Sequence, residues 1–548
     1  MTTEGESGKS SIPGASLNLI NSIAGAAIVA IPHAIQQCGL FLGLFLLIFL
    51  AYSMHHIITA LMDCALRAGE LNLEDLTGRF FGPRGRTVTL VVMLLYTLGS
   101  MVACMVVVGD TLPPAISDLF GYYRVRTKDE IVIIVAVLVV LPLSLVRDVS
   151  SLAFASGMAF IAIFVLVLGV LTQGPAESHA QGLTFTASEI TIVNRHLFRG
   201  IGVLSFHYVC QHSCLLIFKS LENPCLEDVK QVSRLSMGAV LFLSLVLGLG
   251  GYLIFGDTID GNVLNNYSTK ATAISLARMC MAINMIFTYP MELFVARHAC
   301  FALLSKLLFS DSDRLGDRYD LADTLSQHSV GSSVSSMRSV NLDNVSSGDS
   351  EHSNDSRDCH GCEQNTEADD FVMLGQWKDI GIRSRLGISS GPPCAESVLH
   401  DRNDSTNVAP PLALHFLMTV ILWSFSLAIA IGFNDVSLVL SLSGIVAASC
   451  LGYIIPVAIY LKTHEDEVRS KFSRSRIPGI AYFCFGGSDE WGSATKIENS
   501  ANQKDLDNNI IFFIALGVFG VCSLVVGLCL EVLSVFGVAK EIDPTVNY

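Results

Sequence analysis

Long apolar runs with almost no charged residues recur along this chain of 548 residues, and they constrain its fold more than any other feature. A helix needs about 20 mostly apolar residues to cross the hydrocarbon core of a bilayer. Because backbone polar groups cannot stay unpaired in lipid, such runs cross it as helices. The sequence therefore predicts an all-α membrane protein with eleven transmembrane helices. The predicted spans are 14–37, 40–66, 88–112, 131–146, 152–171, 200–218, 236–255, 271–291, 410–433, 436–461 and 510–538.

Positive charge is divided unequally between the two sets of alternating loops. With the whole segment 292–409 between the eighth and ninth predicted spans left aside, the loops and terminus on one side contain 16 Lys and Arg residues, and those on the other side contain 7. Loops rich in Lys and Arg remain in the cytosol. This bias predicts a cytosolic N-terminus and a C-terminus on the opposite, outer side of the membrane.

Acidic residues are concentrated in one segment of the chain. The formal net charge is −15, and residues 310–408 contain 18 Asp and Glu, 8 Lys and Arg, and 19 Ser. A segment with so few apolar residues cannot form a core, which predicts a disordered cytosolic loop. Its serines make it a candidate site for a kinase or a regulatory partner. The negative balance argues against nucleic-acid binding through phosphate contacts.

The spans and loops predict a linear organisation of the chain. The segments are a cytosolic N-terminus (1–11), a membrane core with helices one to eight (12–309), the acidic Ser-rich loop (310–408), helices nine and ten (409–461), a cytosolic loop (462–509), helix eleven (510–538) and an outer C-terminus (539–548). On the outer loop before the eighth span, Asn266-Tyr267-Ser268 forms a sequon that predicts N-glycosylation of Asn266.

Two of the predicted spans are interrupted near their centres. The first contains a helix-weak stretch from Asn21 to Pro32, and the sixth contains polar and aromatic residues from Ser205 to His212. The first and sixth spans hold equivalent positions in two sets of five, and paired interruptions of this kind indicate a transporter binding site. The alternative interpretation is that Gly25 and its small neighbours simply allow close helix packing.

Five motifs stand out along the chain: Asn21-Ser22-Ile23-Ala24-Gly25 followed by Ile31-Pro32-His33-Ala34, Gly109-Asp110-Thr111-Leu112, Leu141-Pro142-Leu143-Ser144-Leu145, the segment 205–212, and the segment 288–297. In this order they resemble the motifs of the sodium-coupled neutral amino acid transporters, which belong to the amino acid/auxin permease group. The resemblance covers about 12–310 and, more weakly, 410–540, and the acidic loop is not part of it.

The resemblance implies a LeuT-like fold, with two inverted repeats of five helices and one additional helix. It also implies a Na⁺ site with oxygens from Asn21 and Ala24 at the first break, the Thr288 hydroxyl on the eighth helix and the Asn284 carbonyl one turn earlier. Such oxygens suit Na⁺, a hard cation. The alternative for Thr288 is a hydroxyl that bonds back to its own helix.

For an amino-acid substrate, the resemblance implies a site at the same two breaks. The carboxylate would meet the N–H groups of Ala26 and Ala27 at a helix N-terminus, and Tyr96 would close over it unless it is a packed tyrosine. The ammonium would contact Ser22 and carbonyls near Phe206 and His207. The family pattern is usually Gly-Ser-Gly, and this chain has Gly25-Ala26-Ala27. The Ala27 methyl therefore favours small substrates or marks altered activity.

Several titratable residues lie within the predicted spans. His207 and His212 are candidates for proton sensing or proton exchange, or are buried histidines with satisfied hydrogen bonds. Arg278 is expected to pair with a carbonyl or with Asp110, and Glu531 to face a neighbouring helix or lie near the membrane interface. The residues near cytosolic helix ends are expected to snorkel or form gate ion pairs; they are Asp63, Glu292 and Arg297.

Together these features predict a secondary active transporter that takes up neutral amino acids with Na⁺ by alternating access around helices one and six, with H⁺ exchange left open. One cation crossing 100 mV supplies about 2.3 kcal/mol, so no ATP site or organic cofactor is needed. The alternatives are an H⁺-coupled amino acid transporter of an organelle membrane and a non-transporting amino acid receptor or sensor. No catalytic constellation can be assembled, which argues against an enzyme. We expect a plasma-membrane or endolysosomal location.

Overall fold

A computed structural model describes residues 10–120, 128–145, 153–182, 196–221, 225–268, 271–330, 412–433, 435–465, 468 and 500–535. Within these residues the protein is helical, as predicted, and the only β pairing is an isolated bridge between Ser10 and Leu221. The longer helices are α3 (Leu40–Ala68), α4 (Leu73–Phe120), α7 (Ala153–Ala180), α10 (Leu226–Phe255), α11 (Thr272–Val330), α13 (Leu412–Gly432) and α18 (Ser500–Val535).

The remaining helices are short, and most of them belong to interrupted spans. They are α1 (Ile12–Ile23), the 3-10 helix η1 (Ala26–Ala30), α2 (Ile31–Cys38), α5 (Lys128–Val135), the π-helix η2 (Ala136–Val140), α6 (Leu141–Leu145), α8 (Leu197–Tyr208), α9 (Gln211–Lys219), the 3-10 helices η5 (Gly256–Thr258) and η6 (Val263–Asn266), α14 (Val436–Ser443), the π-helices η8 (Gly444–Ala448) and η9 (Cys450–Ile454), and α15 (Ile455–Thr463).

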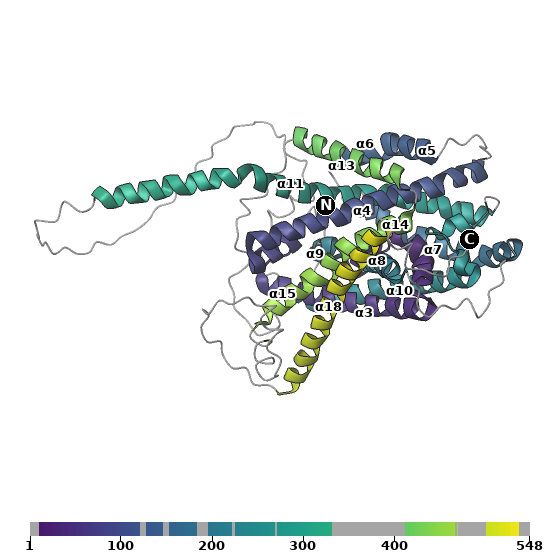
Figure 1. Ribbon diagram of the computed structural model, residues 1–548, viewed down its shortest axis with the longest axis horizontal. Coiled ribbons are helices and arrows are strands. Elements are labelled where there is room, and N and C mark those ends of the chain that lie inside the picture. Colours follow the sequence, from purple (N-terminus) through teal and green to yellow (C-terminus); the bar gives the residue numbers. More distant parts are fainter. Residues whose placement is uncertain are drawn as a thin grey trace, which may run out of the picture.

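The helices form one bundle (Figure 1). Helix α11 packs along α4 and α7, α10 packs against α3 and α1, and α8 packs against α2 and α14. Helix α18 crosses the bundle obliquely, and α11 continues well beyond it (Figure 1). The interrupted helices therefore lie among long, continuous ones.

Nine helices within the described residues are long and apolar enough to cross a membrane, and the bent pair Ile12–Ile23 and Ala26–Cys38 raises the number to ten. The predicted fourth span, 131–146, corresponds to Lys128–Leu145, which is not among them. This segment begins with Lys128, Asp129 and Glu130, which shorten its apolar part. The protein is thus a multi-pass membrane protein with nine or ten spans in the described part of the chain.

Apolar side chains on the outside of the bundle mark the surface that faces lipid. On α3, Phe41, Phe45, Ile48 and Tyr52 are all exposed. Their spacing places them on one face of the helix. A soluble protein would seldom expose so large an apolar stripe, so this exposure supports membrane insertion.

Several helices extend beyond the predicted boundaries, because hydropathy marks only the part of a helix that lies in lipid. Helix α11 continues to Val330, so residues 310–330 of the predicted loop are helical. No proline occurs between Pro290 and Val330 to end the helix. Helix α18 likewise begins at Ser500 within the predicted loop 462–509. Residues 331–411 and 536–548 lie outside the described residues.

Helix α4 begins at Leu73, earlier than the predicted span, and bends at Gly82. The φ of Gly82 is 68° and its ψ is −167°, a conformation that glycine adopts without the steric cost of a side chain. Pro83 follows, and a proline disfavours the α conformation in the residue before it. The segment before the bend is therefore a separate helical piece at one end of the bundle.

Candidate functional site: two facing helix breaks

The first helix breaks between Ile23 and Ala26, as predicted. The axes on either side of this break differ by 53°. Ala24 ends the preceding helix, with its N–H donating to the Ile20 carbonyl at 2.8 Å. A 3-10 helix that begins at Ala26 leaves its first N–H groups without partners in the helix. A Cβ atom added to Gly25 would find no atom within 4 Å, so the break borders open space.

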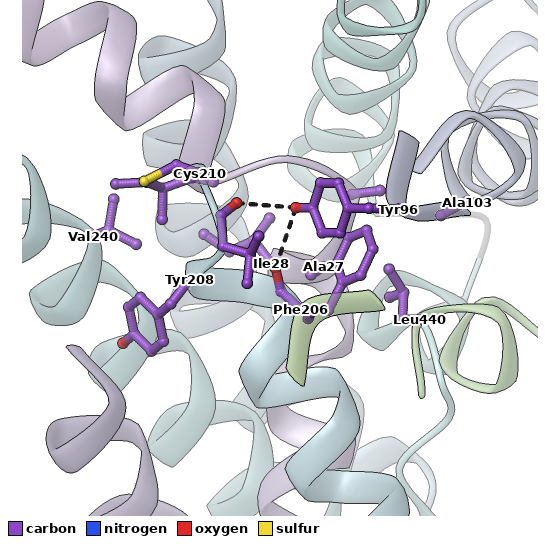
Figure 2. Close-up of a cluster of buried hydrophobic side chains, with 14 of the residues drawn as sticks. Ala27, Ile28, Tyr96, Ala103, Phe206, Tyr208, Cys210, Val240 and Leu440 are labelled. Atoms are coloured by element: carbon purple, nitrogen blue, oxygen red, sulfur yellow. Dashed lines mark hydrogen bonds between the residues drawn. The ribbon is translucent and has the colours of Figure 1, made fainter. Parts of the chain in front are cut away.

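The sixth predicted span also breaks, between Tyr208 and Gln211. Val209 is extended, with φ −74° and ψ 121°, which interrupts the helical hydrogen bonds. The Tyr96 hydroxyl of α4 donates to the Val209 carbonyl at 3.0 Å and lies 3.5 Å from the Phe206 carbonyl (Figure 2). Tyr96 thus satisfies carbonyls that the break exposes.

The two breaks lie against each other. The hydroxyls of Ser22 and Ser213 are 2.5 Å apart and join α1 to α9. Helix α8 also packs against η1. Figure 2 shows Ala27 and Ile28 of the first break beside Phe206 and Tyr96, whose rings stack with centroids 4.7 Å apart. The structure thereby brings together Ala27, Tyr96 and Phe206 of the predicted substrate residues, and it places Ser22 at the contact between α1 and α9.

Asn21, the first of the predicted Na⁺ residues, lies where α1 approaches α7 and α11. The Asn21 side-chain nitrogen is 3.4 Å from the Ser156 hydroxyl of α7 and 3.9 Å from the Met291 sulfur of α11. Thr288 and Asn284 precede Met291 at positions that share a helix face. Asn21 Oδ1 is buried and has no hydrogen-bond partner among the described residues. An unpaired buried oxygen is suited to a cation.

The Thr288 hydroxyl also bonds back to its own helix, as the alternative interpretation expected. Its Oγ1 donates to the Asn284 carbonyl at 2.9 Å. A hydroxyl that donates in this way keeps its oxygen lone pairs for a second partner. The hydrogen bond is therefore compatible with a ligand role and does not establish one.

The structure separates the two histidines of the sixth span. His207 Nε2 is 2.8 Å from the Ser244 hydroxyl of α10, which makes it a buried histidine with a hydrogen bond. His212 lies on the other side of the break, with its Nε2 3.8 Å from Oε1 of Glu292 on α11. Its ring centroid is 4.9 Å from that of Tyr96.

The charged residues of the spans are paired across helices. Arg278 donates to the carbonyls of Leu264 and Tyr267 at 2.8 Å each, which confirms the expected carbonyl pairing. Asp110 instead pairs with Lys128 at 2.5 Å. Glu531 faces a neighbouring helix, as expected, where its oxygens accept two hydrogen bonds from Arg199 on α8.

Glu292 and Arg297 do not snorkel, because both side chains are buried. Of the two alternatives expected for Glu292, the ion pair fits better, since its Oε1 lies within ion-pair distance of His212. Arg297 donates to the Thr419 hydroxyl of α13 at 2.9 Å. Each side chain projects inward from the face of α11 that packs against other helices. Asp63 does form an ion pair, with Arg67 one turn later on the same helix at 2.8 Å.

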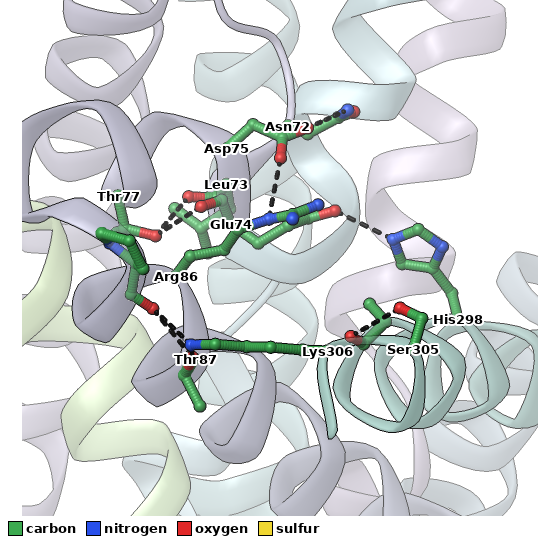
Figure 3. A network of polar contacts seen from close by, with 12 residues as sticks. Asn72, Leu73, Glu74, Asp75, Thr77, Arg86, Thr87, His298, Ser305 and Lys306 are labelled. Atoms are coloured by element: carbon green, nitrogen blue, oxygen red, sulfur yellow. Dashed lines mark hydrogen bonds and ion pairs between the residues drawn. The ribbon is translucent and has the colours of Figure 1, made fainter. Parts of the chain in front are cut away.

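Sequence reasoning missed a polar network that joins the short first part of α4 to α11 (Figure 3). Glu74 Oε1 lies 2.9 Å from His298 Nε2, and Lys306 donates to the Pro83 carbonyl at 3.1 Å. Arg86 pairs with Asp75 across the bend at 3.1 Å. The network ties the bent end of α4 to α11. The partners are distant in sequence, so no local pattern could have revealed it.

Asn266 of the predicted glycosylation sequon lies in η6. Its side-chain nitrogen donates to the Thr258 carbonyl and its oxygen accepts from the Asp260 N–H, both at 2.9 Å. The neighbouring carbonyls bind Arg278, so this loop is held against α11.

Comparisons with known proteins show which family the chain belongs to. Residues 8–488 match the family described as transmembrane amino acid transporter protein. Vacuolar amino acid transporter 2 of Saccharomyces cerevisiae is 29% identical over 53% of this chain and 61% of its own length. A Danio rerio protein named "Putative sodium-coupled neutral amino acid transporter 11" is 30% identical over 56% of this chain and 68% of its own length.

A Mus musculus protein of that same name is 28% identical over 53% of this chain and 64% of its own length. The match thus spans about two thirds of the length of these relatives. A crystal structure of the Eremococcus coleocola manganese transporter is 12% identical, with a TM-score of 0.37 over 95% of this chain and 97% of that chain. The sequence relatives from yeast, zebrafish and mouse are named as amino acid transporters, not enzymes. The chain belongs to the transmembrane amino acid transporter protein family.

Proposed function

We propose that this protein is a secondary active transporter that couples the movement of neutral amino acids to Na⁺ by alternating access. The observation that carries the proposal is the pair of facing helix breaks, where the first N–H groups of η1 lack partners within the helix and lie beside open space at Gly25. Hydrocarbon cannot satisfy such groups, so a polar ligand is their natural partner. We further propose eleven spans, with Lys128–Leu145 as the fourth, in the LeuT-like arrangement of two inverted repeats.

The substrate carboxylate would bind at the N–H groups of Ala26 and Ala27, where a helix N-terminus favours an anion. The ammonium would contact Ser22 and the Phe206 carbonyl. Tyr96 already bonds to carbonyls at the second break, so substrate entry would exchange those bonds for bonds to the ligand. The Ala27 methyl is buried in the same place, and this crowding favours small substrates such as alanine.

The Na⁺ ion, as a co-transported substrate, would bind between α1 and α11. Asn21 Oδ1, the Ala24 carbonyl, the Thr288 hydroxyl and the Asn284 carbonyl are the proposed ligands. The unpaired state of Asn21 Oδ1 supports this choice, since a buried polar atom without a partner is costly. The names of the relatives include both a vacuolar and a sodium-coupled transporter, so the protein would act at an endolysosomal or a plasma membrane.

Replacing the proposed ligands should weaken Na⁺ dependence. We expect Asn21→Ala and Thr288→Ala each to raise the Na⁺ concentration that gives half-maximal alanine uptake by about tenfold, equivalent to about 1.4 kcal/mol of lost binding. The measurement is alanine uptake into proteoliposomes across a series of Na⁺ concentrations, with choline replacing Na⁺.

Thr111→Ala is the matched control for this experiment. Thr111 is a buried threonine of α4 whose hydroxyl donates to the Val107 carbonyl at 2.7 Å, as Thr288 donates to Asn284. Removing it costs the same kind of hydrogen bond away from the proposed ligands, so the Na⁺ requirement should not change. An unchanged Na⁺ requirement in both Asn21→Ala and Thr288→Ala would refute the ligand assignment.

A further inference from the structure

A carboxylate and an imidazole are buried together between α9 and α11. His212 Nε2 and Glu292 Oε1 are 3.8 Å apart, and 3% and 11% of the two side chains remain exposed. Each residue also has a second polar atom, His212 Nδ1 and Glu292 Oε2, that lacks a hydrogen-bond partner among the described residues. Two buried titratable groups with unused hydrogen-bonding capacity are not explained by packing.

The surroundings of the pair suit a proton and do not suit a metal ion. The Tyr96 ring lies against His212, and Cys104 of α4 is close enough to Glu292 to interact with its charge. Ser100 of α4 lies beside the carboxylate. The phenol and the thiol are neutral at physiological pH and supply few hard oxygens. Among the described residues, no three His, Cys, Asp or Glu side chains form a group that could hold a metal.

Burial favours a pair that carries one proton. With one proton the pair is neutral overall, either as a carboxylic acid beside a neutral imidazole or as a carboxylate beside an imidazolium. With none it would leave a net negative charge inside the membrane, which is costly. Arg297, five residues later on α11, donates to the Thr419 hydroxyl and to the Ser144 carbonyl. Release of the proton therefore requires that the site open to water.

The pair is mechanically connected to the second helix break. His212 is the second residue of α9, directly after that break, whereas Glu292 belongs to the continuous helix α11. Tyr96 contacts both the break and the pair. Its hydroxyl donates to the Val209 carbonyl in the break, and its ring lies against the His212 ring. A ligand that takes the Tyr96 hydroxyl from these carbonyls would also disturb the contact with His212.

We propose that Glu292 and His212 form a proton-binding site that takes up and releases one proton in each transport cycle. The proposal rests on the function proposed above. It assigns proton coupling to this pair, whereas Asn21 and Thr288 are the proposed ligands of Na⁺. This role is not assigned to His207, because its Nε2 faces the Ser244 hydroxyl and not a carboxylate. The proton exchanges with water on whichever side of the membrane the moving break exposes.

The test measures proton and alanine movement separately in proteoliposomes that contain the full-length protein and a pH-sensitive dye, with the membrane potential clamped. For the unaltered protein, adding L-alanine should move protons in proportion to labelled alanine. Glu292→Gln retains the size of a protonated carboxyl but cannot release a proton. We expect it to reduce the alanine-induced proton flux at least tenfold, while exchange of labelled for unlabelled alanine stays within about twofold.

Asp63→Asn is the control, because Asp63 is a carboxylate of α3 with its own partner, Arg67, and should leave both fluxes unchanged. Proton flux that persists in Glu292→Gln would overturn the proposal, as would alanine transport by the unaltered protein without proton movement. Loss of exchange as well as proton flux in both Glu292→Gln and His212→Asn would overturn it too. The proposed transport function fails separately, when the unaltered protein moves no amino acid at all.

Discussion

Glu531→Leu is expected to destabilise the protein by about 3 kcal/mol, the low end of the range for breaking a buried ion pair. Glu531 accepts hydrogen bonds from Nε and Nη2 of Arg199 at 2.8 and 2.9 Å, which joins α18 to α8. The substitution removes the carboxylate that pairs directly with the guanidinium, in a site where 22% of the Arg199 side chain is exposed. Asp435 then remains as the negative charge that acts on Arg199. The measurement is the midpoint of thermal unfolding in detergent, followed by size-exclusion chromatography.

The double variant Arg199→Met/Glu531→Leu distinguishes the loss of the ion pair from a general defect in packing. It removes both charges and leaves apolar side chains of similar size, so most of the stability should return. Asp63→Leu serves as a second control, since the exposed pair with Arg67 should contribute only about 0–1 kcal/mol. If the double variant is as unstable as Glu531→Leu, the loss of stability does not come from the unpaired Arg199 charge, and the prediction is wrong.

Gly25→Val is expected to reduce amino acid uptake at least tenfold while the protein still folds. A Cβ at Gly25 meets no atom within 4 Å, so the valine side chain enters space that the protein itself does not fill. The same space lies at the N-terminus of η1, where the proposed substrate carboxylate binds. Labelled alanine uptake and the unfolding midpoint, measured on the same preparations, separate the loss of binding from a loss of stability.

Gly238→Val is the matched control for Gly25→Val. Gly238 lies in α10 on the outside of the bundle, and a Cβ there also meets no atom within 4 Å. The same increase in volume, away from both breaks, should leave uptake and stability unchanged. If Gly25→Val transports alanine as well as the unaltered protein, the substrate does not use the gap at Gly25, and the placement of its carboxylate is wrong.

The sequence predicted the features that depend on local composition. Apolar runs located most of the spans, and the weak helical stretches around Gly25 and Val209 located both breaks. Helix ends were less predictable, because a helix that leaves the bilayer need not stop. Nothing in the apolar pattern of α11 indicated that it continues to Val330.

Side-chain pairing across helices could not be predicted. Arg199 and Glu531 are separated by 332 residues, and their contact depends on how α8 and α18 pack. The same holds for the contact between His212 and Glu292. Sequence reasoning placed Glu292 near a helix end and expected it to snorkel or to form a gate ion pair. It could not choose between the two, because burial depends on the rotation of α11, which composition alone does not reveal.

The most direct test of the central claim is uptake of a panel of labelled amino acids into proteoliposomes with an imposed Na⁺ gradient and with choline in its place. The claim that the two facing breaks form a Na⁺-coupled substrate site predicts concentrative uptake of small neutral amino acids that disappears in choline. Binding of an amino acid without any flux would contradict it and favour a receptor. Uptake that is the same in Na⁺ and in choline would contradict the Na⁺ coupling assigned to Asn21 and Thr288.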